Sequence, residues 1–214
     1  MIKQSIAVLG LGKYGRSLAE SLYEMGAEVL VADKNEDIVK EFTNKATVAV
    51  CADLSNEDEV LALDLKNMDI VIAAMGRSIA ASIMTVAVAK EQGVKLVVAK
   101  TSSDRMSSIL KKVGADKILD PEYEGGRRSA HILSSSLLDY MELDDNFCIV
   151  ELKARKNWVG KNLIELDLRK NYNMNVVAIK EQGGNWSFAS PSKKVKESNI
   201  FLVALEKKDL KKFK

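Results

Sequence analysis

Residues 8–16 read Val-Leu-Gly-Leu-Gly-Lys-Tyr-Gly-Arg, and this stretch decides the fold. It places Gly10, Gly12 and Gly15 in G-x-G-x-x-G spacing, after a short apolar run and before a helical pattern. A strand, a glycine turn and a helix in this order are the context in which the motif binds dinucleotides. Gly10 permits the tight turn, Gly12 lets the backbone approach a diphosphate, and Gly15 lets the helix pack closely on the strand. The free N–H groups at the helix start then face the anion.

A carboxylate follows where the motif requires one. Residues 28–33 read Glu-Val-Leu-Val-Ala-Asp, an expected second strand that ends in Asp33, about 20 residues past the glycine turn. An acid there accepts hydrogen bonds from ribose hydroxyls and disfavours the 2′-phosphate of NADP. The sequence therefore predicts a nucleotide or dinucleotide site. The alternative is a Rossmann unit that keeps the turn without a ligand.

Length and composition narrow the class of protein. The chain has 214 residues, enough for one large domain or for one domain with a small second one, and its formal net charge of +2 gives no reason to expect a nucleic-acid partner. Cys51 and Cys148 lie in apolar runs, have no metal-ligand spacing, and are expected to be buried thiols. The basic tail, residues 206–214, is expected to be a solvated helix.

Strands and helices alternate beyond Asp33. Further strands are expected at 47–51, 69–76, 95–99 and 116–119, and helices at 35–44, from 55 onward, at 78–92 and at 103–113. The spacing of about 20 to 25 residues per strand–helix pair is typical of a doubly wound parallel sheet in an α/β protein.

This alternation stops at Asp120-Pro121. The pattern after it predicts a helix over residues 127–141, with an apolar stripe formed by Ala130, Leu133, Leu137 and Tyr140. Because so apolar a helix needs a surface to cover, we interpret it as a connector that packs between subunits. The alternative is that it packs on its own sheet.

The remaining residues form a smaller module. Strands are expected at 147–154, 175–180 and 200–205, with a helix at 162–168. Because a module of this size is only marginally stable alone, we expect it to dimerise or to dock on its neighbour. The predicted domains are 1–120, a nucleotide-binding domain; 121–143, a connector and interface helix; and 144–214, a small α+β domain.

The order of these parts resembles the regulator-of-potassium-conductance (RCK) proteins, specifically their Ktr/Trk-type cytoplasmic subunits. The resemblance covers nearly the whole chain and rests on the glycine motif, Asp33, Ala73-Ala-Met-Gly76, Gly114-Ala-Asp116 with Pro121-Glu122, and residues 160–169 and 176–179 of the second module. A single Rossmann unit is more similar to the Ktr type than to the Trk type, which carries two.

The resemblance implies a regulatory protein and not an enzyme. It implies an RCK_N domain followed by an RCK_C (TrkA-C) domain, in dimers that assemble into an octameric ring. Such a subunit is cytoplasmic, at the inner face of the cell membrane, and gates a potassium-translocating membrane subunit when ATP or ADP, or NAD(H), binds.

The expected ligand contacts follow from the motifs and the resemblance together. Lys13 would neutralise phosphate, Asp53 would contact adenosine, and Gly76 would allow close approach. The full set expected to bind nucleotide is Gly10, Gly12, Lys13, Tyr14, Gly15, Asp33, Lys34, Asp53, Leu54, Ala74, Met75, Gly76 and Lys100.

Two further ligands are implied by the resemblance. Glu122 would help bind Mg²⁺ or Ca²⁺ with the nucleotide, or it is a solvated carboxylate. Cyclic di-AMP would bind the second module at Ile164, Arg169, Asn175 and Pro191, although Asn175 stands where an aromatic or imidazole ring would suit a base better.

Two rival functions remain at this point. An NAD(H)-dependent dehydrogenase needs a positioned acid or base, and His131, the sole histidine, is remote from the glycine motif and is expected to be partly buried or at an interface. A redox-sensing binding protein that regulates transcription needs a recognition helix and a basic face, and the sequence shows neither.

Overall fold

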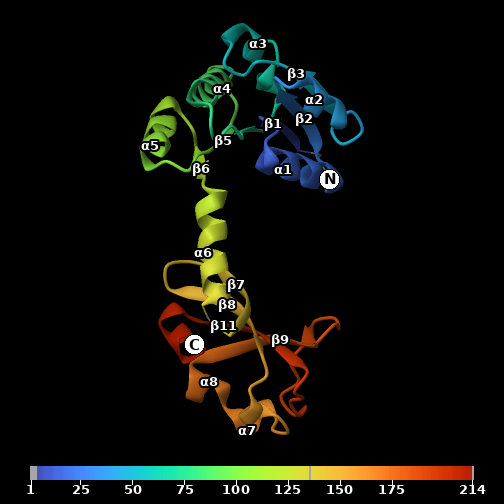
Figure 1. The fold of residues 1–214 in the computed structure, drawn as a ribbon, viewed down its shortest axis with the longest axis vertical. Coiled ribbons are helices and arrows are strands. Elements are labelled where there is room, and N and C mark those ends of the chain that lie inside the picture. Colours follow the sequence, from blue (N-terminus) through green and yellow to red (C-terminus); the bar gives the residue numbers. More distant parts are fainter. Residues whose placement is uncertain (1–3, 135, 214) are drawn as a thin grey trace. The chain divides into compact units, whose positions relative to one another are not determined.

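The computed structural model describes residues 4–134 and 136–213 and divides into two compact units, Met1–Tyr123 and Glu124–Lys214 (Figure 1). We call them unit 1 and unit 2. Within the described residues, no helix has both the length and the apolar character needed to span a bilayer.

Unit 1 is built on a parallel sheet in the order β3-β2-β1-β4-β5-β6. Its strands are β1 (Ser5–Leu9), β2 (Glu28–Asp33), β3 (Val48–Cys51), β4 (Ile70–Ala73), β5 (Leu96–Lys100) and β6 (Lys117–Leu119). The order reverses between β1 and β4, and ligands of such sheets bind in the crevice at the carboxyl ends of the strands at that point. The doubly wound Rossmann-like sheet is thus confirmed.

Helices cover both faces of this sheet (Figure 1). They are α1 (Lys13–Glu24), α2 (Glu36–Glu41), α3 (Glu57–Leu61), α4 (Ile79–Glu91) and α5 (Asp104–Val113), with a 3₁₀ turn at Leu65–Asn67. Alternate residues of β1 point to opposite faces. Ile6 and Val8 join one core with α1 and α2, whereas Ala7 and Leu9 join the other with α3, α4 and α5.

Unit 2 holds an antiparallel sheet in the order β10-β9-β11-β8-β7. Its strands are β7 (Leu137–Glu142), β8 (Phe147–Lys153), β9 (Met174–Glu181), β10 (Ser187–Phe188) and β11 (Asn199–Glu206), and its helices are α7 (Leu163–Leu166), α8 (Leu168–Tyr172) and 3₁₀ segments at Lys156–Trp158 and Lys207–Phe213. Trp158 and Phe201 pack edge to face in its core.

The expected helix over 127–141 is wrong. The helix, α6, spans Pro121–Leu133, and β7 follows it. Leu137 and Tyr140 are buried on the same face because an irregularity between Leu137 and Asp139 shifts the register with β8. Such a bulge interrupts the two-residue period, so two strand residues three apart imitate a helical stripe. Leu133, by contrast, is exposed.

Side chains bind α6 to β7 within unit 2. Arg128 makes a bidentate ion pair with Asp139, with N–O distances of 2.7 and 2.8 Å from one nitrogen. The ring of His131 stacks on Tyr140, with the ring centroids 3.9 Å apart. The partly buried His131 expected from the sequence is therefore confirmed as a packing residue.

Three smaller expectations also change. The helix expected at 162–168 divides into α7 and α8, because Asp167 between them adopts a left-handed conformation with φ of 39°. Cys51 is exposed because β3 is the edge strand, while Cys148 is buried as expected. The tail forms a 3₁₀ helix that buries Leu210 and Phe213 instead of a solvated helix.

Candidate functional site

The glycine turn lies between β1 and α1, and its geometry excludes side chains at two of its three glycines. Gly10 has φ of +96°, and a Cβ added there would lie 2.7 Å from Met75. A Cβ added to Gly15 would lie 2.0 Å from the backbone oxygen of Gly10. Gly10 therefore makes the turn and Gly15 allows α1 to approach it, as the sequence predicted for each.

Gly12 differs from its two neighbours. It caps α1 with φ of −65°, and a Cβ added there would meet nothing within 4 Å. The first turn of α1 contains no acidic residue, and no side chain caps it. The positive end of the helix dipole, with the backbone N–H groups of Lys13 and Gly15, therefore faces a site that an anion can enter.

Asp33 lies at the rim of this turn. Its Oδ2 accepts a hydrogen bond from the backbone N–H of Leu11 at 2.7 Å, and its Oδ1 accepts one from Asn35 at 2.9 Å. These bonds fix the carboxylate in place at the end of β2. Each carboxylate oxygen has a second lone pair, so the group can still accept ribose hydroxyls.

The loop after β4 packs against the glycine turn. The backbone N–H of Ala74 donates to the carbonyl of Leu9 at 2.7 Å, and Met75 lies against Gly10. The hydroxyl of Ser82 donates to the Met75 carbonyl at 2.7 Å, so α4 holds the loop from behind. Ser82 escaped the sequence analysis because a serine inside a helix gives no local signal of a loop partner.

Lys100 and Glu122, which were predicted as separate ligand contacts, bind each other. The ammonium of Lys100, a residue only 8% exposed, lies 2.7 Å from Oε1 of Glu122 in the first turn of α6. Lys100 holds the pKa of the Glu122 carboxyl below its usual value. A Cβ added to Gly76 would lie 2.8 Å from the same ammonium, so Lys100 also supports the β4–α4 loop.

The other expected contacts differ in how far their side chains are available to a ligand. Asp53 accepts hydrogen bonds from the hydroxyl and the backbone N–H of Ser55, which lower the pKa of its carboxyl. Leu54 is buried in the core, so its side chain is not available to a ligand. Lys13 and Lys34 are exposed, and Tyr14 packs partly against the core on the α1 side.

The residues predicted for a second ligand lie in unit 2. Ile164 is exposed on α7, and the backbone N–H of its neighbour Leu163 donates to the carbonyl of Pro191 at 3.1 Å. Arg169 on α8 and Asn175 on β9 are exposed. Across the described part of the chain, no three His, Cys, Asp or Glu residues are grouped so that they could hold a metal ion.

The strand order, the glycine turn and the acid at the end of β2 define a Rossmann-like domain of the nucleotide-binding type. Residues 6–121 match the TrkA-N domain family. The chain is 38% identical to Ktr system potassium uptake protein C of Bacillus subtilis, over 99% of this chain and 96% of that protein. It is 36% identical to Ktr system potassium uptake protein A of the same organism, over 98% and 95%. The chain therefore belongs to the Ktr potassium uptake proteins of the TrkA-N family.

A solved structure shows the same fold. The GsuK channel bound to NAD superposes with a TM-score of 0.67 at 16% sequence identity, over 97% of this chain and 38% of that chain. The predicted family resemblance is confirmed by these comparisons. The dehydrogenase alternative finds no support, because the relatives are potassium uptake proteins and His131 stacks on Tyr140 in unit 2.

Proposed function

We propose that this chain is a nucleotide-binding regulatory subunit that gates a membrane potassium transporter of the Ktr type. The observation that carries the proposal is the open N-terminus of α1 at Gly12, beside the carboxylate of Asp33, which is fixed by the N–H of Leu11 in the same turn. The two Ktr relatives, which match over nearly the whole chain, support a role for this site in potassium uptake.

The proposed site divides the ligand between two groups of residues. The diphosphate lies on the N–H groups of the first turn of α1, where Gly12 leaves room and Lys13 adds a positive charge. Asp33 accepts the ribose hydroxyls, and Asp53 lies toward the adenosine. The ligand is ATP or ADP, or NAD(H); it is bound and not transformed, and a solved neighbour of the same fold is described as bound to NAD.

A structural change caused by nucleotide binding is transmitted from the glycine turn to α6 through residues in contact. Met75 lies on Gly10, Gly76 lies on the ammonium of Lys100, and Lys100 pairs with Glu122 in the first turn of α6. A ligand that moves the β4–α4 loop therefore disturbs the ion pair between Lys100 and Glu122. Mg²⁺ or Ca²⁺ bound with the nucleotide would compete with Lys100 for the same carboxylate.

The assembly and the second ligand complete the proposal. The subunit is cytoplasmic, forms dimers that assemble into an octameric ring, and docks on the inner face of a membrane potassium-translocating subunit. Unit 2 serves as the RCK_C domain, and cyclic di-AMP binds it at Ile164, Arg169, Asn175 and Pro191. The hydrogen bond between Leu163 and Pro191, which joins two of these surfaces, supports a shared site.

Calorimetric titration of the purified chain with ATP, ADP, NAD and NADH, alongside light scattering, tests the central claim. We expect saturable binding, a mass near that of eight subunits, and loss of binding in Asp33→Ala. Asp37→Ala is the matched control, because Asp37 is an exposed acid at the start of α2. Unchanged affinity in folded Asp33→Ala would refute the ribose assignment, and absence of binding by all four nucleotides would refute the site.

A further inference from the structure

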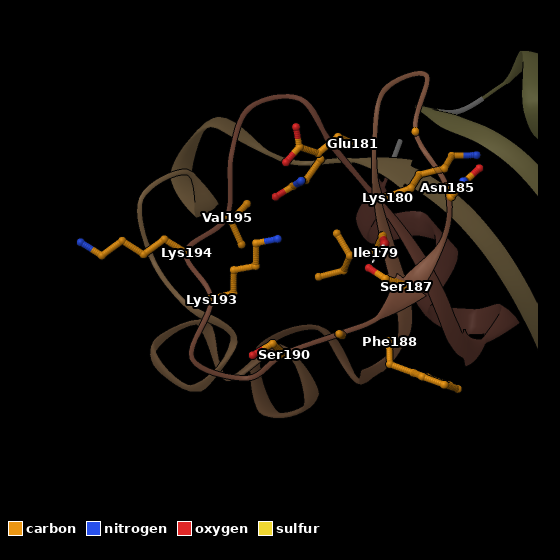
Figure 2. A pocket seen from close by; sticks show the side chains of 13 residues that line it. Ile179, Lys180, Glu181, Asn185, Ser187, Phe188, Ser190, Lys193, Lys194 and Val195 are labelled. Carbon is orange, nitrogen blue, oxygen red and sulfur yellow. Dashed lines mark hydrogen bonds between the residues drawn. The ribbon is translucent and has the colours of Figure 1, made fainter.

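A hollow lies in unit 2, between the β9–β10 hairpin and the segment that leads into β11 (Figure 2). Its volume is about 480 Å³, within the range of small-molecule sites, about 300 to 1,000 Å³. None of the residues assigned above to the nucleotide or to cyclic di-AMP lines it.

The wall formed by the β10–β11 segment is held in place by backbone hydrogen bonds. The N–H of Val195 donates to the carbonyl of Lys161 at 2.8 Å, and the N–H of Gly160 donates to the carbonyl of Val195 at 2.9 Å. The side chain of Asn199 accepts from the N–H of Lys196 at 2.8 Å. This hollow is therefore preformed, which lowers the ordering cost of a ligand.

Apolar and charged groups are segregated within the hollow. Ile179 and the buried Val195 face each other across it (Figure 2), and Phe188, which is 91% exposed, lies on its rim. An aromatic ring left in water at the mouth of a hollow offers a stacking surface.

Most charges around the hollow are already neutralised. Lys180 donates to Glu151 at 3.1 Å and lies over the ring of Trp186. Glu181 pairs with Lys196 at 2.7 Å. These two side chains therefore leave little net charge for a ligand to meet.

Lys193 differs from these residues. Its ammonium makes no ion pair or side-chain hydrogen bond with any residue from 4–134 or 136–213, although its charge helps to lower the pKa of the Glu181 carboxyl, which is already paired with Lys196. Figure 2 shows its side chain directed into the hollow, next to Val195 and Ile179, whereas Lys194 points away. Because Glu181 is already paired with Lys196, the second cation, Lys193, leaves a net positive charge beside an apolar floor, which attracts the acidic end of a molecule whose body is apolar.

We propose that this hollow is a binding site for a small organic anion, a phosphate or a carboxylate carried on an aromatic body. Lys193 binds the anionic group, and Ile179 and Val195 contact the body. The ring of Phe188, which is directed away from the hollow in Figure 2, turns over the rim to stack on the bound molecule. The site belongs to unit 2 alone and does not depend on nucleotide binding in unit 1.

Methyl NMR of the full chain, with labelled isoleucine and valine, tests this site directly. The probes are AMP, indole-3-acetate and the neutral adenosine, and the signals followed are those of Ile179 and Val195. We expect at least one of the two anions to shift both signals and adenosine to leave them unchanged; which anion does so decides between phosphate and carboxylate. The titration is repeated in Asp33→Ala, in which unit 1 should not bind nucleotide, so that shifts that persist there come from binding to unit 2.

Two variants identify the residues responsible. Lys193→Gln should weaken binding of the active probe about tenfold, as expected for loss of a charge-assisted hydrogen bond. Lys194→Gln, the matched control from the adjacent position, should change it by less than about twofold. Both residues are exposed, so both variants should fold. Absence of shifts with both anions, an equal response to adenosine, or an unchanged affinity in Lys193→Gln would each overturn the proposal.

Discussion

Gly12 and Gly15 belong to one motif, yet the structure predicts different consequences when each is changed to alanine. Gly15→Ala should destabilise unit 1, whereas Gly12→Ala should fold normally and bind nucleotide poorly. The contrast separates the two roles of the glycine turn, packing and ligand approach.

The magnitudes follow from the space around each Cβ. At Gly15 the new Cβ would lie 2.0 Å from the oxygen of Gly10, and a Cβ does not approach a non-bonded heavy atom closer than 3.0 Å, so the backbone must move by at least 1 Å. In a packed interior such a shift costs about 3 kcal/mol. At Gly12 there is no contact. The loss of a glycine cap, about 0.5 to 1 kcal/mol, is largely offset by the lower entropy of the unfolded chain, about 0.4 to 1 kcal/mol.

The assay uses the distribution of tryptophan. Both tryptophans, Trp158 and Trp186, lie in unit 2, so their fluorescence reports that unit alone. Hydrogen exchange measured by mass spectrometry on peptides from β1 and α1 reports unit 1. In Gly15→Ala we expect faster exchange in those peptides and an unchanged fluorescence transition in urea. In Gly12→Ala we expect native exchange and at least about tenfold weaker binding of ATP or NADH.

Two results would refute this reasoning. Native exchange protection in Gly15→Ala would show that α1 does not need the close approach seen at Gly10. Native nucleotide affinity in Gly12→Ala would show that no phosphate comes near the open face of the first turn of α1.

Two other predictions concern titrating groups. Lys100→Met removes the cation that lowers the pKa of Glu122, so that pKa should rise in a carboxyl NMR titration; Lys90→Met, whose lysine pairs with a different acid, should leave it unchanged, and no rise in Lys100→Met would contradict the ion pair. Burial raises the pKa of the Cys148 thiol to about 11, so the unfolded chain loses this proton first and the free energy of unfolding of unit 2 should fall as pH rises from about 9 to 11. Cys148→Ala should reduce the dependence of this free energy on pH, measured by the fluorescence transition. Cys51→Ala should leave it unchanged, because that thiol is exposed. An equal pH dependence in the wild type and both variants would exclude the Cys148 thiol as its source.

The sequence was informative where a local pattern has one structural solution. The three glycines of the turn, the apolar β1 run and the acid that ends β2 each constrain neighbouring residues, and the sheet of unit 1 follows from their repetition. The side chain of Asn35, just before α2, accepts from the backbone N–H groups of Asp37 and Ile38 for the same local reason.

The local sequence pattern gave wrong predictions where burial depends on pairing with a strand distant in the sequence. Leu137 and Tyr140 have helical spacing, but their burial comes from pairing with β8 across an irregular register, which no short window of sequence contains. Cys51 lies in an apolar run, but it is exposed because β3 pairs with a strand on one side only. The local sequence does not show which strand will lie at the edge of the sheet.

The sequence by itself determined the glycine turn, the position of Asp33, the doubly wound sheet and the resemblance to RCK proteins, because each depends on residues close together in the chain. Only the tertiary structure decided that Lys100 and Glu122, 22 positions apart, neutralise each other, and that the side chain of Lys193 is directed into a hollow with an apolar floor. Burial and charge pairing depend on which elements meet in space, and folding alone brings those elements together.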